Sequence, residues 1–306
     1  MELIAYTSEA GFDHRPPEGH PERAERLRAV HAAIENAGVV RREAPRAERA
    51  QIERVHARAH IDRVFSASPQ AGETALDSDT WMSPGSLEAA LRAAGAGVAG
   101  VDAVLAGEAE AVFAACRPPG HHAEPDRAMG FCLFNTVAIA AHHALEAHGL
   151  SRAAVIDIDV HHGNGTQAVA EAEPRLVFAS IHQGWIYPGT GAAHETGTHG
   201  NIVNAPMEAG TRGLTWREAI ETRLLPAIEA QAPDILLVSA GFDGHAADPL
   251  AGLELDAADY AWAGERLAAF ARQHAHSRLV CVLEGGYDCP ALEASTEAFL
   301  RALSAA

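Results

Sequence analysis

The sequence is poor in cysteine and in positive charge. It has four cysteines in 306 residues and no CxxC pair, so we expect buried thiols and no structural disulfide. Lysine plus arginine number 23 against 41 aspartate plus glutamate, which gives a formal charge of −18. That sign is wrong for a surface that follows phosphates, so we expect no nucleic-acid partner, whereas a cationic substrate is compatible.

Long apolar runs are also missing. Residues 1–20 contain no basic region followed by an apolar stretch, and no later window is apolar for long enough to span a bilayer. We therefore expect a soluble, cytoplasmic protein without a membrane partner. Because the chain has no compositional break, linker or internal repeat, we predict a single domain over residues 1–306.

What is present is an alternation of apolar, strand-length runs with helical patterns. The strand candidates are residues 111–116, 153–160, 176–182, 234–241 and 278–286, and the helix candidates are residues 86–107, 135–149, 214–231 and 256–274. Near-continuous apolar strands that alternate with helices are typical of a parallel sheet covered on both faces. We therefore predict a three-layer α/β fold, in which ligands bind outside the carboxyl ends of the strands.

The run AVIDIDVHH ends a buried strand in ionisable side chains. Because side chains alternate along a strand, Asp157, Asp159 and His161 are predicted to share one face. Desolvating unpaired carboxylates is costly, and a divalent cation is the simplest way to offset their charge. Asp-x-His supplies two metal ligands, and a third would come from another strand.

Two aspartates in GFDGHAADPL compete for the third ligand position. We favour Asp248, although an aspartate before proline is also a common turn residue. The rival, Asp243, lies nearer the strand end and can instead cap a loop. A divalent cation bound here would have two oxygen ligands and one nitrogen ligand.

Two other strand ends carry candidate catalytic groups. In RPPGHH, prolines and a glycine give the irregular backbone that lets His121 and His122 address one site. A second pair, His142 and His143, falls in a helical pattern, and we interpret it as solvated. In LEGGYD, the glycines leave room beside Tyr287, whose hydroxyl can enter a cavity, although a structural tyrosine in a turn fits this motif alone.

Taken together, five stretches resemble those of a known family. RPPGHHAEPDRAMGFC, DIDVHHGNGTQ, YPGTG, SAGFDGHAADPLAG and LEGGYD, in that order, are similar to the zinc-dependent histone deacetylases and their bacterial histone deacetylase-like and acetylpolyamine amidohydrolase relatives. The resemblance implies the arginase-deacetylase fold with an eight-stranded parallel sheet. It also implies hydrolysis of an acetyl or short acyl amide on a lysine side chain, with acetylpolyamine as the alternative substrate.

The resemblance further implies a role for each matching residue. The ligands of the catalytic zinc would be Asp159, His161 and Asp248, a set that ferrous iron can also occupy. The catalytic groups would be His121, His122, Tyr287, Asp157 and Asn164, with His122 as general base and acid and Tyr287 as donor to the oxyanion. The substrate-binding residues would be Gly130, Phe131, Tyr187, Leu255 and Arg23, of which Arg23 would line an acetate-release channel. A structural potassium ion would be held by Asp157 and Ser180.

Some positions bear on subclass and substrate. Asn164 stands where the human class I enzymes have aspartate, so the pKa of His122 should be raised less than beside a carboxylate. Polyamine-selective relatives often carry an acidic gatekeeper or a long N-terminal loop, whereas here Leu250 follows the Asp-Pro pair and the loop over 11–20 is short. These features favour acetyl-lysine. Asp79 could line the rim of the site or cap a helix.

Two other function classes are compatible with this kind of fold. A ureohydrolase of the related arginase fold would need additional carboxylates for a second metal ion, where this chain has histidine and asparagine after Asp-x-His. A non-catalytic acetyl-lysine binder would not need Tyr287 and the tandem histidines, which are all present.

Overall fold

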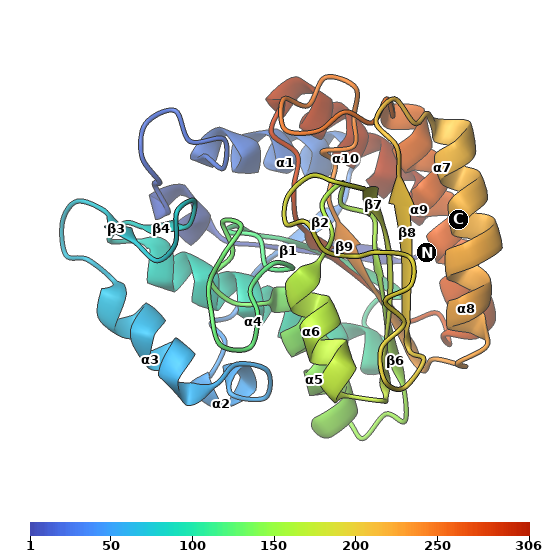
Figure 1. The fold of residues 1–306 in the computed structure, drawn as a ribbon, viewed down its shortest axis with the longest axis horizontal. Coiled ribbons are helices and arrows are strands. Elements are labelled where there is room, and N and C mark those ends of the chain that lie inside the picture. The colour runs from blue at the N-terminus through green and yellow to red at the C-terminus, as the bar shows by residue number, and fades with distance from the viewer.

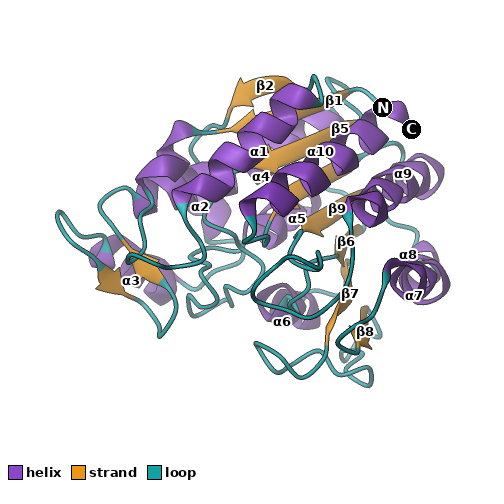
Figure 2. Ribbon diagram, turned by 90° about the horizontal axis from the view of Figure 1, so that it is seen from above, coloured by secondary structure: helices purple, strands orange, loops and turns teal.

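The centre of the protein is an eight-stranded sheet in which every neighbouring pair is parallel. The computed structural model describes residues 1–306. In sheet order the strands are β2 (Val40–Glu43), β1 (Leu3–Thr7), β5 (Ala111–Ala115), β10 (Leu279–Leu283), β9 (Ile235–Ala240), β6 (Ala153–Asp157), β7 (Leu176–Gln183) and β8 (Ile202–Met207). Figure 2 shows β2 at one edge of the sheet and β8 at the other. The predicted three-layer α/β fold with an eight-stranded parallel sheet is confirmed.

Helices cover both faces of the sheet (Figure 1). On one face lie α1 (Ala24–Asn36), α7 (Gly213–Ala219), α8 (Leu225–Glu229), α9 (Ala257–His274) and α10 (Cys289–Ala305), with a π-helical segment, Ile220–Leu224, between α7 and α8. On the other face lie α2 (Arg49–Ile52), α3 (Arg58–Ala67), α4 (Ser86–Leu105), α5 (Thr136–Glu146) and α6 (Asn164–Ala172). Outside these layers are a 3₁₀ turn, Glu9–Asp13, and the antiparallel pair β3 (Thr74–Ala75) and β4 (Trp81–Met82).

Alternation along each strand divides the apolar side chains between two cores. In β5, Phe113 belongs to the core under α1 and α7 to α10, whereas its neighbours Val112 and Ala114 belong to the core under α2 to α6. A central strand is therefore apolar at most of its positions, which explains why these strands are visible in the sequence as nearly continuous apolar runs. None of the helices is both long and apolar enough to cross a bilayer, and all four cysteines are free thiols.

The strand predicted over 153–160 ends earlier, at Asp157. The carboxylate of Asp157 accepts the backbone N–H of Asp159 at 3.1 Å, and that of Asp159 accepts the N–H of His161 at 2.8 Å. Aspartate side chains that capture a backbone N–H two residues on replace the ladder hydrogen bonds of a strand with turns. The ionisable residues after β6 therefore lie on irregular backbone at the edge of the sheet.

Candidate active site

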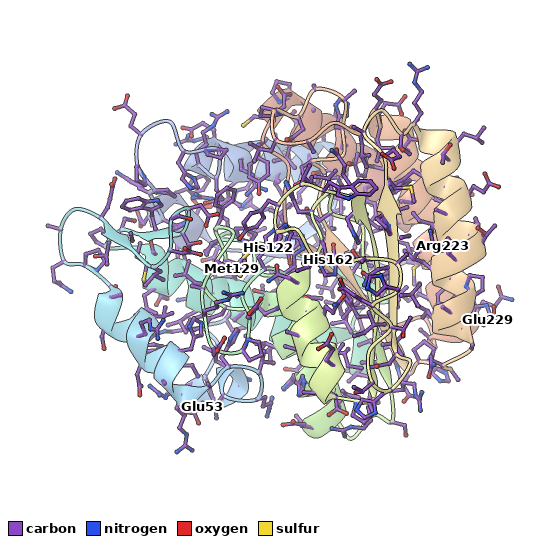
Figure 3. The ribbon with its side chains drawn as sticks, in the orientation of Figure 1. Glu53, His122, Met129, His162, Arg223 and Glu229 are labelled. Carbon is purple, nitrogen blue, oxygen red and sulfur yellow. The ribbon has the colours of Figure 1, made fainter.

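The carboxyl ends of four adjacent strands, β5, β10, β9 and β6, deliver polar side chains to one edge of the sheet. The tandem histidines follow β5, Tyr287 follows β10, Asp243 follows β9, and Asp159 with His161 follow β6. His122 lies beside the amino end of α6, where it contacts Asn164 (Figure 3). Because these strands are neighbours, residues far apart in the chain converge there.

Asp159, His161 and Asp243 form a buried group suited to a metal ion. One ligand atom of each residue lies within 4.8 Å of the others. Nδ1 of His161 is 3.2 Å from Oδ1 of Asp159 and 3.1 Å from Oδ2 of Asp243. The backbone N–H of Val160 donates to the other oxygen of Asp243 at 2.9 Å and fixes the direction of this carboxylate.

The third member of this group is Asp243, whereas the sequence analysis favoured Asp248 as the third ligand. Both oxygens of Asp248 accept backbone N–H groups, since Oδ2 accepts the N–H of Tyr287 at 2.7 Å and Oδ1 accepts that of Leu250 at 3.0 Å. Its carboxylate thus organises the turn that carries Tyr287. The rival candidate, which stands closer to the end of β9, points into the group instead.

Two glycines make room for these carboxylates. A Cβ atom on Gly241 would lie 2.1 Å from Oδ2 of Asp159, and a Cβ atom on Gly285 would lie 2.0 Å from Oδ2 of Asp243. Burial opposes a charge on His161, but hydrogen bonds to the carboxylates of Asp159 and Asp243 raise the pKa of His161 to about 10. The group therefore attracts positive charge. Two carboxylate oxygens and one imidazole nitrogen fit a zinc site that keeps a fourth position open.

The two tandem histidines have opposite electrostatic environments. Nδ1 of His121 is 3.0 Å from Oδ2 of Asp157. Although burial lowers it, the charges of Asp159 and Asp157 raise the pKa of His121 well above its usual value. Burial, together with His121 and His161, lowers the pKa of His122 well below its usual value. Environments that push two such pKa values apart are typical of acid–base sites.

His122 is held by Asn164 in one orientation. Its Nδ1 is 2.8 Å from Oδ1 of Asn164, and Nδ2 of the same amide donates to Glu124 at 2.7 Å. Because the amide nitrogen of Asn164 donates to Glu124, the atom that faces the imidazole is the amide oxygen. Nδ1 of His122 therefore carries the hydrogen that this oxygen accepts. Nε2 is left as the acceptor toward the pocket. The predicted contact between His122 and a neutral amide is confirmed.

A pocket of about 240 Å³ opens above this group. It is lined by Asp79, His122, Gly130, Phe131, His161, Tyr187, Leu250 and Tyr287. The rings of Phe131 and Tyr287 meet edge to face at 5.8 Å, and those of His122 and Tyr187 at 5.0 Å. Gly130 has φ +57°, and a Cβ atom there would lie 2.4 Å from the His122 ring. The structure thus brings the predicted residues Gly130, Phe131, Tyr187 and Tyr287 together around His122.

Asp79 belongs to the rim of this pocket and caps no helix. Its Oδ1 accepts the backbone N–H of Gly130 at 3.1 Å, while α4 begins only at Ser86 after an N-cap at Gly85.

Two predicted substrate-binding residues lie elsewhere. Leu255 is 1% exposed and belongs to the apolar core, because its backbone pairs with Gly244 and Ala246 and turns the side chain inward. The leucine that lines the pocket is Leu250, which is 36% exposed. The side chain of Arg23 is 46% exposed at the start of α1 and faces Glu25, so the structure does not place it on an internal channel.

A buried network that the sequence analysis missed lies behind Tyr287. The guanidinium of Arg26, three residues after Arg23, is 4.7 Å from the centre of the Tyr287 ring and donates to the carbonyl of Gly286 at 2.5 Å. It also pairs with Glu22 at 3.0 Å. Arg26 lies on the apolar face of α1, one helical turn before Val30. This helical periodicity is the signal that could have identified Arg26 as a buried residue.

Glu284 is a second buried residue that the sequence analysis did not consider. It is 0% exposed, and its Oε2 accepts the N–H of Gly120 at 2.6 Å and that of His121 at 3.1 Å. Burial raises the pKa of Glu284 to about 7. Its carboxylate ties the end of β10 to the loop that carries the tandem histidines.

The fold and this site define a class of protein, a hydrolase of the α/β fold class with two buried histidines beside a group of candidate metal ligands. A family model described as histone deacetylase domain matches residues 20–303. The chain belongs to the histone deacetylase family, with a deacetylase or amidohydrolase activity.

Relatives agree over nearly the whole chain. A histone deacetylase-like amidohydrolase of Pseudomonas aeruginosa is 39% identical over 293 residues, 92% of this chain and 77% of that protein. A probable deacetylase of Methanothermobacter thermautotrophicus is 41% identical over 302 residues, 95% of this chain and 88% of that protein. The crystal structure of the HDA15 HD domain matches with a TM-score of 0.92 at 33% identity and covers 98% of this chain and 89% of that one.

Proposed function

We propose that this protein is a zinc-dependent deacetylase that removes acetyl groups from lysine side chains and releases acetate. The observation that carries the proposal is that His122, His161 and Tyr287 line one pocket, with Asp159 and Asp243 directly behind His161. Asp159, His161 and Asp243 would hold the zinc ion, which when bound polarises a carbonyl and acidifies a water molecule.

The residues of the chain would divide the proton transfers between them. His122 would accept the proton of the attacking water at Nε2, since Nδ1 is committed to Asn164, and would later deliver a proton to the leaving amine. The hydroxyl of Tyr287 would donate to the oxyanion. His121 with Asp157 would tune the charge beside His122.

The shape of the pocket supports a slender substrate. Phe131 and Tyr187 would flank the methylene stem of an acetyl-lysine, and the carbonyl of Gly130 would accept the amide N–H. Leu250 at the mouth offers no charge to a second ammonium group, and the carboxylate of Asp79 on the rim accepts the backbone N–H of Gly130, which favours acetyl-lysine over an acetylpolyamine. Asp157 and Ser180, fully buried and paired across β6 and β7, would contribute to a structural potassium site.

The test compares substrates on one zinc-loaded preparation. Acetate release is measured from acetyl-lysine peptides of several sequences, acetylputrescine and acetylspermidine. Higher kcat/KM on the peptides supports the proposal, and higher kcat/KM on the polyamines replaces lysine with polyamine as the substrate. Hydrolysis of a guanidino compound without acetate release would indicate a ureohydrolase and overturn it.

A further inference from the structure

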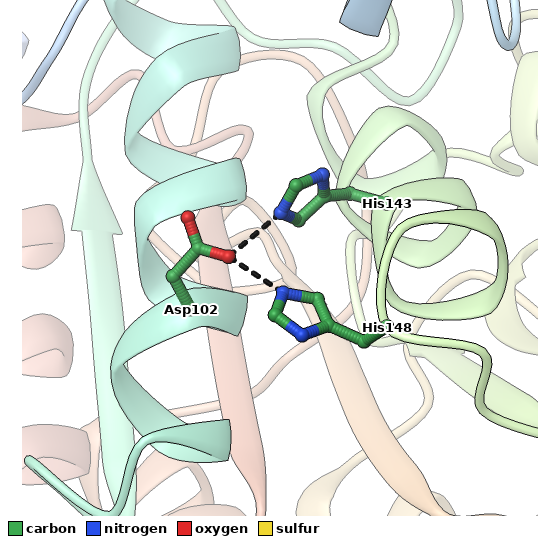
Figure 4. A group of neighbouring side chains, drawn as sticks. All are labelled: Asp102, His143 and His148. Carbon is green, nitrogen blue, oxygen red and sulfur yellow. Dashed lines mark hydrogen bonds and ion pairs between the residues drawn. The ribbon is translucent and has the colours of Figure 1, made fainter.

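A second group of potential metal ligands lies far from the pocket. Nε2 of His143 and Nε2 of His148 are each 2.7 Å from the same atom, Oδ1 of Asp102, as Figure 4 shows. The ligand atoms of the three residues lie within 4.8 Å of one another. The sequence predicted a solvated pair at His142 and His143, which is wrong, because each is only 7% exposed.

The position of this group separates it from the candidate active site. Asp102 lies in the last turn of α4, which leads into β5, and His143 lies in the last turn of α5, which leads into β6 through the loop that contains His148. The group therefore stands at the amino ends of the strands, at the opposite edge of the sheet from the tandem histidines. None of its members is involved in the proposed reaction.

We propose that Asp102, His143 and His148 form a second site for a divalent transition metal of the zinc and cobalt type. Two imidazole nitrogens and one carboxylate oxygen are a ligand set that such ions prefer, with a fourth position left to water. Two of the ligands are carried by packed helices, and the third comes from a loop. The ion would tie that loop to α4.

The present distances are close to those that coordination requires. Metal–ligand bonds of 2.0–2.1 Å in a tetrahedron separate neighbouring ligand atoms by about 3.3 Å, so each 2.7 Å contact must open by roughly 0.6 Å. The side chains of Asp102 and His148 are 53% and 34% exposed, and rotation of these two can supply that movement. Partial burial would raise the pKa of Asp102, but the hydrogen bonds from His143 and His148 lower it, so the carboxylate is ionised.

Arg54 opposes metal binding at His143. Its Nη1 donates to Nδ1 of His143 at 2.7 Å, which leaves the ring proton on Nε2, the atom that would bind the ion. On coordination the proton must move to Nδ1, and Arg54 must turn away. Glu146, whose Oε2 is 3.6 Å from Nε of Arg54, offers it another partner. The side chain of Arg54 would therefore set the affinity of the site.

The first experiment counts ions. Wild-type protein, Asp102→Asn, His148→Ala and the control His199→Ala are equilibrated with Co²⁺ or Zn²⁺, freed of excess ion, and analysed for metal per chain and for the visible absorption of Co²⁺. His199 is an exposed histidine outside the group. We expect wild type and His199→Ala to hold one equivalent more than the other two variants. Equal counts in all four proteins, or a loss in His199→Ala as well, would overturn the proposal.

Two further measurements separate metal binding from folding and from catalysis. Circular dichroism without added metal shows whether each variant is folded, and the zinc-loaded Asp102→Asn protein should keep wild-type deacetylase turnover.

A variant of Arg54 tests the ligand atom of His143. In Arg54→Gln, the carbonyl of the new amide can accept a hydrogen bond from Nδ1–H of His143. We expect Co²⁺ to bind about tenfold more tightly, which is the size of effect usual for outer partners of a metal-bound histidine. Weaker binding in Arg54→Gln would contradict the assignment of His143 Nε2 as a ligand.

Discussion

Oδ1 of Asn164 lies 2.8 Å from Nδ1 of His122 and receives its hydrogen. This neutral amide orients the imidazole without adding negative charge beside it. Burial and two neighbouring histidines then keep the pKa of His122 low, so that its Nε2 is unprotonated and able to accept a proton. The asparagine at this position should therefore set the pH range in which His122, the proposed base, is active.

Replacing Asn164 by Asp should therefore shift the pH dependence of the activity. A carboxylate this close favours the imidazolium and raises the pKa of His122, typically by about one to three units. In Asn164→Asp we expect the acidic limb of kcat/KM to shift to higher pH by at least about one unit, measured on an acetyl-lysine peptide with zinc-loaded protein. Asn164→Ala removes the hydrogen bond without adding charge and serves as the control. An acidic limb at the same pH in wild type and Asn164→Asp would show that His122 is not the base.

Tyr287→Phe tests the oxyanion donor. Loss of a single donor of this kind typically lowers kcat by about a hundred- to a thousandfold. The ring would keep its edge-to-face contact with Phe131 and its place beside Arg26, so the melting temperature should change little. Single-turnover rates and thermal melts measure the two effects. Wild-type turnover in Tyr287→Phe would remove the tyrosine from the mechanism.

The two aspartates after β9 should differ in their effect on the metal. Asp243→Asn weakens the ligand group and should lower zinc retention on dialysis against a chelator by at least about tenfold, whereas Asp248→Asn leaves the three ligands in place. An asparagine at 248 can accept only one of the two backbone N–H groups, so its turn around Tyr287 should loosen and kcat should fall. Elemental analysis of both variants decides between them, and loss of zinc from Asp248→Asn alone would restore the ligand set predicted from the sequence.

The sequence was informative for five of the six inner strands of the sheet, and the exception is β1, which was missed although all five of its residues are buried. The central strands are continuous apolar runs, so the parallel sheet and its ligand edge could be predicted. The edge strand β2, with sequence VRRE and exposed or half-buried side chains, has no such pattern, and neither does β8, which contains Asn204 and Pro206. These two strands were missed because they lie at the edges of the sheet, where residues need not be apolar.

The candidate site was harder to predict where the direction of a side chain depends on distant backbone. The spacing of Asp243 and Asp248 is compatible with either as a ligand. What separates them is that Val160 orients the first, whereas Tyr287, 39 residues further on, donates to the second. The channel role predicted for Arg23 depends on a similar detail. Arg23 stands just before α1, whereas Arg26, three residues later, is buried because it lies on the apolar face of this helix.

Acid should destabilise the protein through buried neutral histidines, of which His56 has the simplest environment. Its ring is 2% exposed; Nδ1 is 3.0 Å from the carbonyl of Glu124, and Nε2 accepts the N–H of Asn135 at 2.8 Å. Protonation of Nε2 would turn this acceptor into a donor that faces another donor. Burial and the nearby His60 lower the pKa of His56 from 6.5 to about 3.

The sign of the effect follows from the two protonation states. Above pH 6.5 the imidazole is neutral in the folded and in the unfolded chain, and it adds no pH dependence. Between pH 6.5 and about 3 the unfolded chain binds the proton and the folded chain does not, so the free energy of unfolding falls as the pH falls. At about pH 4.5 the loss from this residue should be about 3 kcal/mol. In His56→Gln, which retains an acceptor near the position of Nε2 and cannot titrate, urea unfolding at about pH 7 and about pH 4.5 should show a loss smaller than wild type by that amount. Equal losses in the two proteins would mean that His56 is already protonated in the folded state or titrates without cost.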